Sequence, residues 1–166
     1  WAARDYADAS WSQGAGAFGF GSDGLGTNID APAPTSNRAI TNYFRKTITV
    51  ANVDQIKKLR LTTWADDGVI VYVNGREVGR KNLGTGAISH ATYANAAPRT
   101  AAAKADPLVM DLVDADIEDT GPITIAAEVH TNYRGTRDIS FDLTATAEFY
   151  TAADPKPDPE PEVPED

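Results

Sequence analysis

Apolar and polar residues alternate along much of the chain from residue 42 onward. The longest such stretch is 139–150, where Ile139, Phe141 and Leu143 are each followed by a polar residue. A period of two places one face of a β-strand in a core and the opposite face in water. The segments expected to form strands are 17–21, 42–50, 56–63, 69–73, 76–80, 108–113, 123–130 and 139–150. They predict an all-β fold, an antiparallel β-sandwich of jelly-roll type with roughly eight strands.

The stretch 65–80 gives the strongest local signal. A β-branched run, Val69–Val73, follows Asp67-Gly68 and precedes Asn74-Gly75. Asn-Gly between apolar runs favours a type I′ hairpin turn, because both central residues of that turn take a positive φ. We therefore expect one hairpin over 65–80, with a turn at Asp67-Gly68 and a second turn at Asn74-Gly75.

Strand direction predicts where the loops lie. If the main strands run alternately up and down, four long loops share one end of the sandwich: 22–37, 64–68, 81–106 and 131–138. The shorter connections share the other end: 51–55, 74–75 and 114–121. The long loops hold most of the aromatic, amide and carboxylate side chains outside the strands. Loops on a rigid scaffold commonly carry function, so we expect any site at the first end.

The C-terminal segment differs from the rest of the chain. Over 154–166 prolines alternate with acidic residues, and almost no apolar residue is present. Such a sequence cannot bury enough surface to offset the entropy of ordering. We expect a sandwich domain over 1–152 and an extended Pro/acidic linker over 153–166, which would lead to a neighbouring domain of the same polypeptide.

Composition narrows the classes of partner. The 166-residue chain has a formal net charge of −9, and the linker segment supplies five of these negative charges. No basic stripe is present, which argues against nucleic acid and anionic membranes, and no apolar run reaches the length of a membrane span. The chain has no cysteine, so disulfides and thiol chemistry are excluded. A Pro/acidic spacer fits an exported modular protein, secreted or at the bacterial cell surface.

Several motifs occur in an order that resembles a known class of modules. They are Trp11-Ser12-Gln13-Gly14, Gly19-Phe20-Gly21, Tyr43-Phe44-Arg45-Lys46, Asp66-Asp67-Gly68, Val71-Tyr72-Val73-Asn74-Gly75, Glu128-Val129-His130 and Asp138-Ile139-Ser140-Phe141-Asp142. Over 11–150 the chain resembles the galactose-binding-like jelly-roll modules of secreted bacterial multidomain proteins, which sit beside glycoside hydrolases and calcineurin-like phosphoesterases. The resemblance implies a non-catalytic accessory module, often carbohydrate-binding and sometimes with a structural calcium.

Aromatic residues in the long loops are candidate sugar contacts. An aromatic face stacks on the C–H face of a pyranose, while nearby amides and charged groups bind its hydroxyls. The candidate aromatics are Trp64, Tyr93 and Tyr133. The candidate polar partners are Asn82, Asn132, Arg134 and Asp138. The alternative for Trp64 is packing beneath a loop as part of the core.

Asp66 and Asp67 are adjacent acids before Gly68. Neighbouring residues of a strand point to opposite faces, so the pair is poorly arranged for glycosidase chemistry, which needs two carboxyls about 5–10 Å apart. We expect these side chains to cap the turn through local hydrogen bonds. Calcium ligation and contact with a sugar hydroxyl are the alternatives.

His130 and Glu128 are predicted to share one polar strand face. The chain has two histidines and no HxH or HExxH spacing, so a zinc site has no sequence support. We expect His130 to anchor the 131–138 loop by a hydrogen bond, with ligand contact as the alternative. For a structural calcium, the candidates near the termini are Asp5, Asp8, Asp23, Asp30 and Glu148.

Three hypotheses follow from the sequence. The first is an extracellular carbohydrate-binding accessory module that tethers a neighbouring domain to glycan or cell wall. The second is a structural or protein-interaction domain that packs on an adjacent secreted enzyme without binding sugar. An enzyme in its own right is disfavoured, because no nucleophile–base motif such as Gly-x-Ser-x-Gly occurs.

Overall fold

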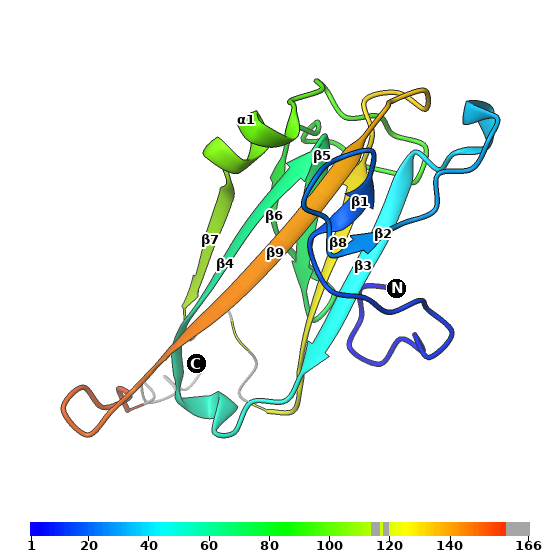
Figure 1. Ribbon diagram of the computed structural model, residues 1–166. Helices are drawn as coiled ribbons and strands as arrows, with labels where there is room; N and C mark the ends of the chain where they lie inside the picture. The colour runs from blue at the N-terminus through cyan, green and yellow to red at the C-terminus, as the bar shows by residue number, and fades with distance from the viewer. Residues whose placement is uncertain (114–116, 118–119, 159–166) are drawn as a thin grey trace, which may run out of the picture.

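Two sheets pack face to face in the computed structural model, which describes residues 1–113, 117 and 120–158 (Figure 1). One sheet has the order β2 (Thr27–Asn28), β1 (Phe18–Phe20), β9 (Ile139–Phe149), β4 (Ile56–Asp66) and β7 (Leu108–Val113). The other has the order β3 (Thr41–Ile48), β8 (Ile123–His130), β5 (Gly68–Val73) and β6 (Arg76–Lys81). All described strand pairs except β1–β2 are antiparallel, so the predicted antiparallel β-sandwich is confirmed.

The core lies between the sheets and follows the predicted alternation. Leu59 and Leu61 of β4 are buried against Val69 and Val71 of β5 and against neighbouring residues of β8. Successive side chains of a strand point to opposite faces, so every second residue of these strands enters one continuous core. Apart from β2, each sheet brings together strands from distant parts of the chain, in the orders β1-β9-β4-β7 and β3-β8-β5-β6.

The second half of β9 departs from the expected burial. Residues 144–149 are exposed, and Phe149 has an exposed fraction of 41%. β1 pairs with β9 only through Ile139–Phe141, so the later part of β9 has β4 as its neighbour on one side and an open edge on the other. The alternating sequence therefore predicts the strand correctly but not its burial.

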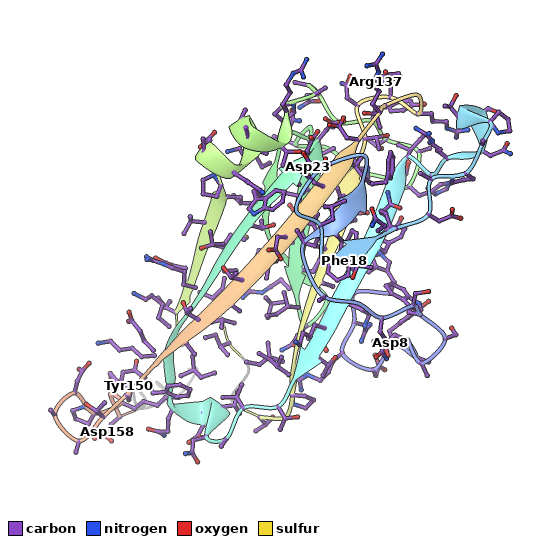
Figure 2. The ribbon with its side chains drawn as sticks, in the orientation of Figure 1. Asp8, Phe18, Asp23, Arg137, Tyr150 and Asp158 are labelled. Carbon is purple, nitrogen blue, oxygen red and sulfur yellow. The ribbon has the colours of Figure 1, made fainter. Side chains whose placement is uncertain are left out.

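The two poles of the sandwich are those that strand direction predicts. The end of β8 at His130 pairs with the start of β3 and the start of β5, and the end of β4 at Asp66 pairs with Ser140 of β9. We call the end formed by 22–37, 64–68, 81–106 and 131–138 the loop-rich pole. The opposite end, formed by 51–55, 74–75 and 149–154, is the hairpin pole. In Figure 2, Arg137 lies at the loop-rich pole and Tyr150 lies at the hairpin pole.

The predicted hairpin is confirmed for β5 and β6 but not for the whole of 65–80. Val73 pairs with Arg76 across a turn in which Asn74 has a φ of 50° and Gly75 a φ of 85°. β4 and β5, however, belong to different sheets, and Asp67 is the single residue that links them. This residue therefore crosses from one sheet to the other.

Short elements within the predicted long loops were not foreseen. The helix α1 (Thr100–Ala105) lies within 81–106, and β2 and the 3₁₀ turn η1 (Thr35–Asn37) lie within 22–37. A second 3₁₀ turn, η2 (Val53–Gln55), precedes β4. Each has six residues or fewer, which is too short to show a clear hydrophobic period in the sequence.

The N-terminal segment covers the outer face of the four-stranded sheet. The Trp1 ring lies 4.6 Å from the Tyr43 ring and 5.4 Å from the Tyr72 ring, measured between centroids. Arg45 of β3 donates to the carbonyl oxygen of Trp1 over 2.6 Å and forms an ion pair with Asp8 at 2.7 Å. A buried arginine thus fixes this segment on the sheet.

The predicted linker begins with ordered contacts. Thr151 and Asp154 form a β-bridge, and Asp154 pairs with Lys57 of β4. Residues 159–166, and most of the predicted 114–121 connection, lie outside the described part of the chain. Within the described residues, no helix has the length and hydropathy that crossing a membrane requires.

Candidate functional site at the loop-rich pole

Two buried aspartates lie at the centre of the loop-rich pole. Asp66 ends β4, Asp67 precedes β5, and their exposed fractions are 4% and 3%. The Thr100 hydroxyl, at the start of α1, donates to Asp66 Oδ2 over 3.0 Å and lies 2.9 Å from the Ser140 hydroxyl. The backbone N–H of Asn132 donates to Asp67 Oδ2 over 2.5 Å. The two carboxyls therefore tie the crossing between the sheets to α1, to β9 and to the loop that precedes β9.

Burial raises the pKa values of both carboxyls. Burial, and then the hydrogen bond to Asp67, raise the pKa of Asp66 from 3.8 to about 7. Burial also raises the pKa of Asp67, while the hydrogen bonds from Asp66 and from the Asn132 N–H act in the opposite direction. Asp66 therefore keeps its proton to a higher pH than a carboxyl in water does, and its protonated form can donate to Asp67. The negative charge of Asp138 raises both pKa values further.

This geometry corrects two expectations for the pair. The carboxyls do not point to opposite faces, because Asp67 lies in the bend between two sheets, where strand alternation does not hold. They also do not act as local turn caps, because their backbone and hydroxyl donors in the described chain lie 34 and 65 residues away. The carboxyls of Asp66 and Asp67 are hydrogen-bonded to each other, whereas the two acids of a glycosidase lie about 5–10 Å apart.

The structure brings the exposed tyrosines onto neighbouring loops. The backbone N–H of Ala94 donates to the carbonyl oxygen of Thr131 over 3.0 Å, and the Asn132 side chain donates to the carbonyl oxygen of Ala94 over 2.8 Å. Tyr93 directly precedes Ala94 and Tyr133 directly follows Asn132, and their exposed fractions are 43% and 54%. Two of the three predicted aromatics therefore face solvent on two loops that are fastened together.

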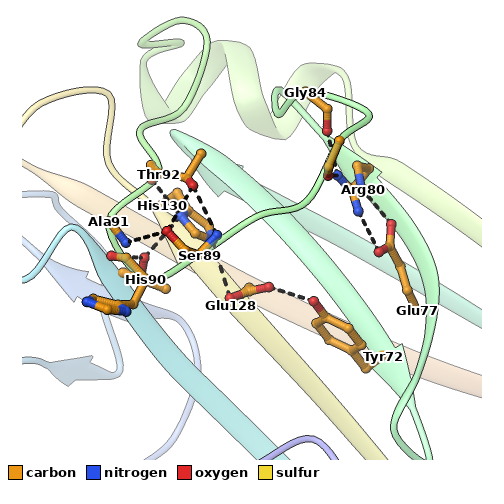
Figure 3. Close-up of polar contacts among 12 residues, drawn as sticks. Tyr72, Glu77, Arg80, Gly84, Ser89, His90, Ala91, Thr92, Glu128 and His130 are labelled. Carbon is orange, nitrogen blue, oxygen red and sulfur yellow. Dashed lines mark hydrogen bonds and ion pairs between the residues drawn. The ribbon is translucent and has the colours of Figure 1, made fainter.

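His130 anchors a different loop from the one expected. Its side chain is fully buried on the outer face of the four-stranded sheet, together with Glu128 (Figure 3). Nδ1 lies 2.8 Å from the carbonyl oxygen of Thr92, so Nδ1 carries a hydrogen and donates it. Thr41 Oγ1 lies 3.0 Å from the same nitrogen. His130 thus holds the segment around Thr92 rather than the 131–138 loop, and it offers no surface to a ligand.

The carboxylate beside His130 is held in its charged form. Tyr72 donates to Glu128 Oε1 over 2.6 Å, and His130 Nε2 lies 3.4 Å from Glu128 Oε2. Burial alone would raise the pKa of Glu128, but the contact with His130 and then the hydrogen bond from Tyr72 lower it below its usual value. Burial, and then the bond to Glu128, raise the pKa of Tyr72. The expected shared face of Glu128 and His130 is confirmed, but it is covered and not open to water.

A cavity of about 260 Å³ lies beside α1 and includes three predicted site residues in its walls, Trp64, Asp67 and Asn82. Lys81 and Asp106, which form an ion pair at 2.6 Å, also line it. The cavity is slightly smaller than the 300–1,000 Å³ that is usual for small-molecule pockets, so it suits a single ring better than a long ligand.

Trp64 and Asn82 also have structural contacts. The Lys104 ammonium group of α1 lies 4.5 Å from the centre of the Trp64 ring, a cation–π distance. The Asn82 side chain donates to the carbonyl oxygens of Ala96, over 2.7 Å, and Asp67, over 3.2 Å. Trp64 is therefore half-buried beneath α1, outside the two core clusters, and also forms part of a cavity wall.

The remaining predicted residues lie on the 131–138 loop. The Arg134 guanidinium donates to the carbonyl oxygen of Ser36 over 3.0 Å. Asp138 is half-buried, and its negative charge acts on Asp66 and Asp67. Sequence reasoning missed Lys81, Thr100, Lys104 and Asp106. A helical run after Pro98 was the available signal for the last three.

The calcium candidates are not gathered into a site. Asp8 pairs with Arg45, and Glu148 pairs with Lys58 at 3.1 Å on another part of the sandwich. Within the described ranges, no group of three His, Cys, Asp or Glu side chains is placed to hold a metal ion.

Comparison with known proteins assigns no family. No protein-family model and no curated protein matches the chain. Among solved structures, a Streptomyces avermitilis alpha-L-rhamnosidase complexed with L-rhamnose matches 70% of this chain and 9% of its own, with 22% identity and a TM-score of 0.48. A Bacteroides uniformis beta-glucuronidase matches 86% of this chain and 15% of its own, with 16% identity and a TM-score of 0.47.

A third structure, a calcium-binding mutant of Bacteroides uniformis beta-glucuronidase 2, matches 69% of this chain and 13% of its own, with 16% identity and a TM-score of 0.40. The chain thus spans a small fraction of each glycosidase chain. All three TM-scores lie below 0.5, so the likeness transfers no function. The class that the chain's own strands define is a two-sheet, largely antiparallel β-sandwich domain.

Proposed function

We propose that this chain is a non-catalytic, extracellular carbohydrate-binding accessory module that holds a neighbouring domain on a glycan or cell wall. The observation that carries the proposal is the pair of exposed tyrosines, Tyr93 and Tyr133, on two loops fastened to each other. Aromatic rings fixed in this way provide an apolar surface for sugar C–H groups at a low entropic cost.

The cavity at the same pole supports this assignment. Its walls combine the Trp64 ring with the charged groups of Lys81 and Asp106. Small-ligand sites typically pair apolar walls with a few polar groups that fix orientation. The Asp106 side chain is 83% exposed despite its ion pair, so its carboxylate oxygens remain accessible to sugar hydroxyls.

Most other predicted polar contacts are engaged within the protein. Asn82, Asn132 and Asp67 each bond to backbone groups of other segments, and they hold the loops that carry the tyrosines. We assign them the role of positioning the binding surface. Asp66 and Asp67 are also buried and hydrogen-bonded to each other, which does not suit the flanking geometry of glycoside hydrolysis.

Affinity electrophoresis through gels that contain different polysaccharides tests the proposal. We expect retention on at least one glycan, and a reduction of about tenfold in affinity for Tyr93→Ala or Tyr133→Ala. Phe149→Ala is the matched control, because Phe149 is an aromatic residue of similar exposure at the hairpin pole. Absence of retention on every glycan, or equal loss in the control, would contradict the proposal.

The second candidate is a structural or protein-interaction domain that packs on an adjacent enzyme domain. The engagement of Asn82, Asn132 and His130 in internal hydrogen bonds favours it. This candidate predicts that the folded chain shows no glycan retention but co-purifies with its neighbouring domain after the linker is cleaved.

A further inference from the structure

Positive side chains are distributed unevenly over the molecule. Six cations form ion pairs with carboxylates: Arg45, Lys57, Lys58, Arg60, Arg80 and Lys81. Arg4, Arg76 and Lys156 have further interactions of their own. Of the remaining cations, Lys46 on β3 and five residues at or next to the loop-rich pole form no ion pair within the described part of the chain: Arg38, Arg99, Lys104, Arg134 and Arg137. We call these last five residues the cationic rim.

Three members of the cationic rim surround the loop that carries Tyr133. Arg38 donates to the carbonyl oxygen of Thr136 over 2.5 Å, and Arg134 donates to that of Ser36 over 3.0 Å. Arg38 also donates through Nε to the carbonyl oxygen of Pro32 over 3.4 Å, whereas the bond of Arg134 uses one nitrogen of its guanidinium. These crossed bonds fix both side chains beside the loop. Arg137 is exposed at the tip of the same pole (Figure 2).

The other two members lie on or next to α1. Arg99 precedes Thr100, whose hydroxyl lies 2.9 Å from that of Ser140 at the start of β9. The beginning of α1 therefore contacts β9 just after the 131–138 loop, which carries Arg134 and Arg137. Lys104, one turn further along α1, lies over the Trp64 ring. The cationic rim thus borders both the cavity and the 131–138 loop.

The acids of this pole do not neutralise the cationic rim. Asp66 and Asp67 are buried, and Asp106 is paired with Lys81. Asp138 and Arg38 are both half-buried. Among the exposed side chains of this pole outside ion pairs, Arg99, Lys104, Arg134 and Arg137 outnumber Asp23 and Asp30, although the whole chain carries a formal net charge of −9.

We infer that the loop-rich pole binds glycans that carry anionic groups, carboxylate or sulfate. The inference rests on the proposed function, because it places a sugar ring on Tyr133 and an anionic substituent of that sugar or its neighbour on Arg134 and Arg137. A guanidinium retains free N–H donors after one bond to a backbone carbonyl, and its planar fork matches the geometry of carboxylate and sulfate oxygens. An exposed tyrosine beside such donors selects a ring that carries negative charge over an uncharged one.

The test compares acidic with uncharged polysaccharides. The probes are polygalacturonate and chondroitin sulfate, set against uncharged dextran and galactan, in affinity gels at 50 mM and 300 mM NaCl. The variants are Arg134→Gln/Arg137→Gln and Arg99→Gln/Lys104→Gln, and each fold is checked by thermal unfolding. Lys46→Gln is the matched control, because Lys46 is exposed on β3 and also lacks a carboxylate partner in the described chain.

We expect retention on at least one acidic polysaccharide, weaker retention at the higher salt concentration, and a loss of about tenfold in affinity for the Arg134/Arg137 double variant. Lys46→Gln is expected to bind as the unsubstituted protein does. Retention on uncharged glycans alone would overturn the inference and leave the proposed function intact. Retention on no glycan would overturn both. If the chain bound double-stranded DNA as tightly as the acidic polysaccharides, the loop-rich pole would be a general polyanion-binding surface. That result would overturn the inferred selectivity for glycans.

Discussion

The two poles of the sandwich are built by different means. At the hairpin pole, Lys57 and Lys58 each pair with a carboxylate, and the chain reverses through a tight turn at Asn74-Gly75. At the loop-rich pole, long connections are held together by buried polar side chains, while the cationic rim has no acidic partners in the described chain. Charged side chains that are paired within the protein are less available to bind a ligand. This difference therefore favours recognition at the loop-rich pole.

The source of local stability differs in the same way. The hairpin turn depends on backbone conformation, because Gly75 has a positive φ that residues with a Cβ adopt at a cost. The loop-rich pole depends on Asp66 and Asp67, which are buried and bonded to separate segments. The first pole is thus specified by neighbouring residues, and the second by residues far apart in the sequence.

The largest expected effect is a pH dependence of the free energy of unfolding that originates at the loop-rich pole. The pKa of Asp66 is raised from 3.8 to about 7 in the folded state. The folded state therefore binds this proton more tightly than the unfolded state. The resulting stabilisation is complete below pH 3.8 and is lost as the pH rises through about 7. The loss is at most about 1.4 kcal/mol for each pH unit within that window.

Asp66→Asn removes this dependence. An asparagine amide donates to Asp67 and accepts from Thr100 at every pH, as the protonated carboxyl does. Urea unfolding should show that the variant gains stability relative to the unsubstituted protein as the pH rises from 4 to 7, with a constant difference above that. Asp154→Asn at the hairpin pole is the control. Parallel stability curves for Asp66→Asn and the unsubstituted protein would refute the raised pKa of Asp66.

The next effect concerns the bond between Asp67 and the 131–138 loop. Asp67→Ala removes a charged acceptor and leaves the backbone N–H of Asn132 without its partner, so we expect a loss of about 2–3 kcal/mol in the free energy of unfolding. The amide hydrogen of Asn132 should also exchange faster with solvent. Asp54→Ala, at an exposed position of the hairpin pole, should leave both quantities unchanged. Continued protection of the Asn132 amide in Asp67→Ala would show that another contact holds the loop.

A smaller effect separates stability from binding at the hairpin pole. Gly75→Ala forces a Cβ into a backbone conformation with φ at 85°. We expect a loss of about 1–2 kcal/mol in the free energy of unfolding, with glycan affinity unchanged. Gly86→Ala is the control, because no atom lies within 4 Å of the added Cβ and the residue does not have a positive φ. A change in affinity for Gly75→Ala would mean that the two poles are coupled.

Features of the fold that depend on local sequence are those that the sequence predicts best. The alternation over 123–130 and the Asn74-Gly75 signal act within a few residues, and the strands and the hairpin turn follow from them. The gathering of long loops at one pole follows from strand direction alone. The fold class and the gathering of the long loops at one pole can therefore be predicted from the amino-acid sequence.

Features that depend on distant partners cannot be predicted in this way. Asp67 reaches Asn132 across 65 residues, and no local pattern specifies that bond. His130 is buried because the segment around Thr92 covers its strand face, whereas the alternation of β8 predicts a wet face there. Trp64 meets Lys104 through a helix of six residues, which is too short to show a period.

The most direct test of recognition at the loop-rich pole is a residue-resolved titration. Two-dimensional ¹H–¹⁵N NMR spectra of the chain are recorded while an oligosaccharide of polygalacturonate is added. We expect the amides of 92–94, 99–104 and 131–138 to shift together and saturably, while those of 51–55 and 74–75 stay in place. Shifts centred on the hairpin pole or on the outer face of either sheet would contradict recognition at the loop-rich pole.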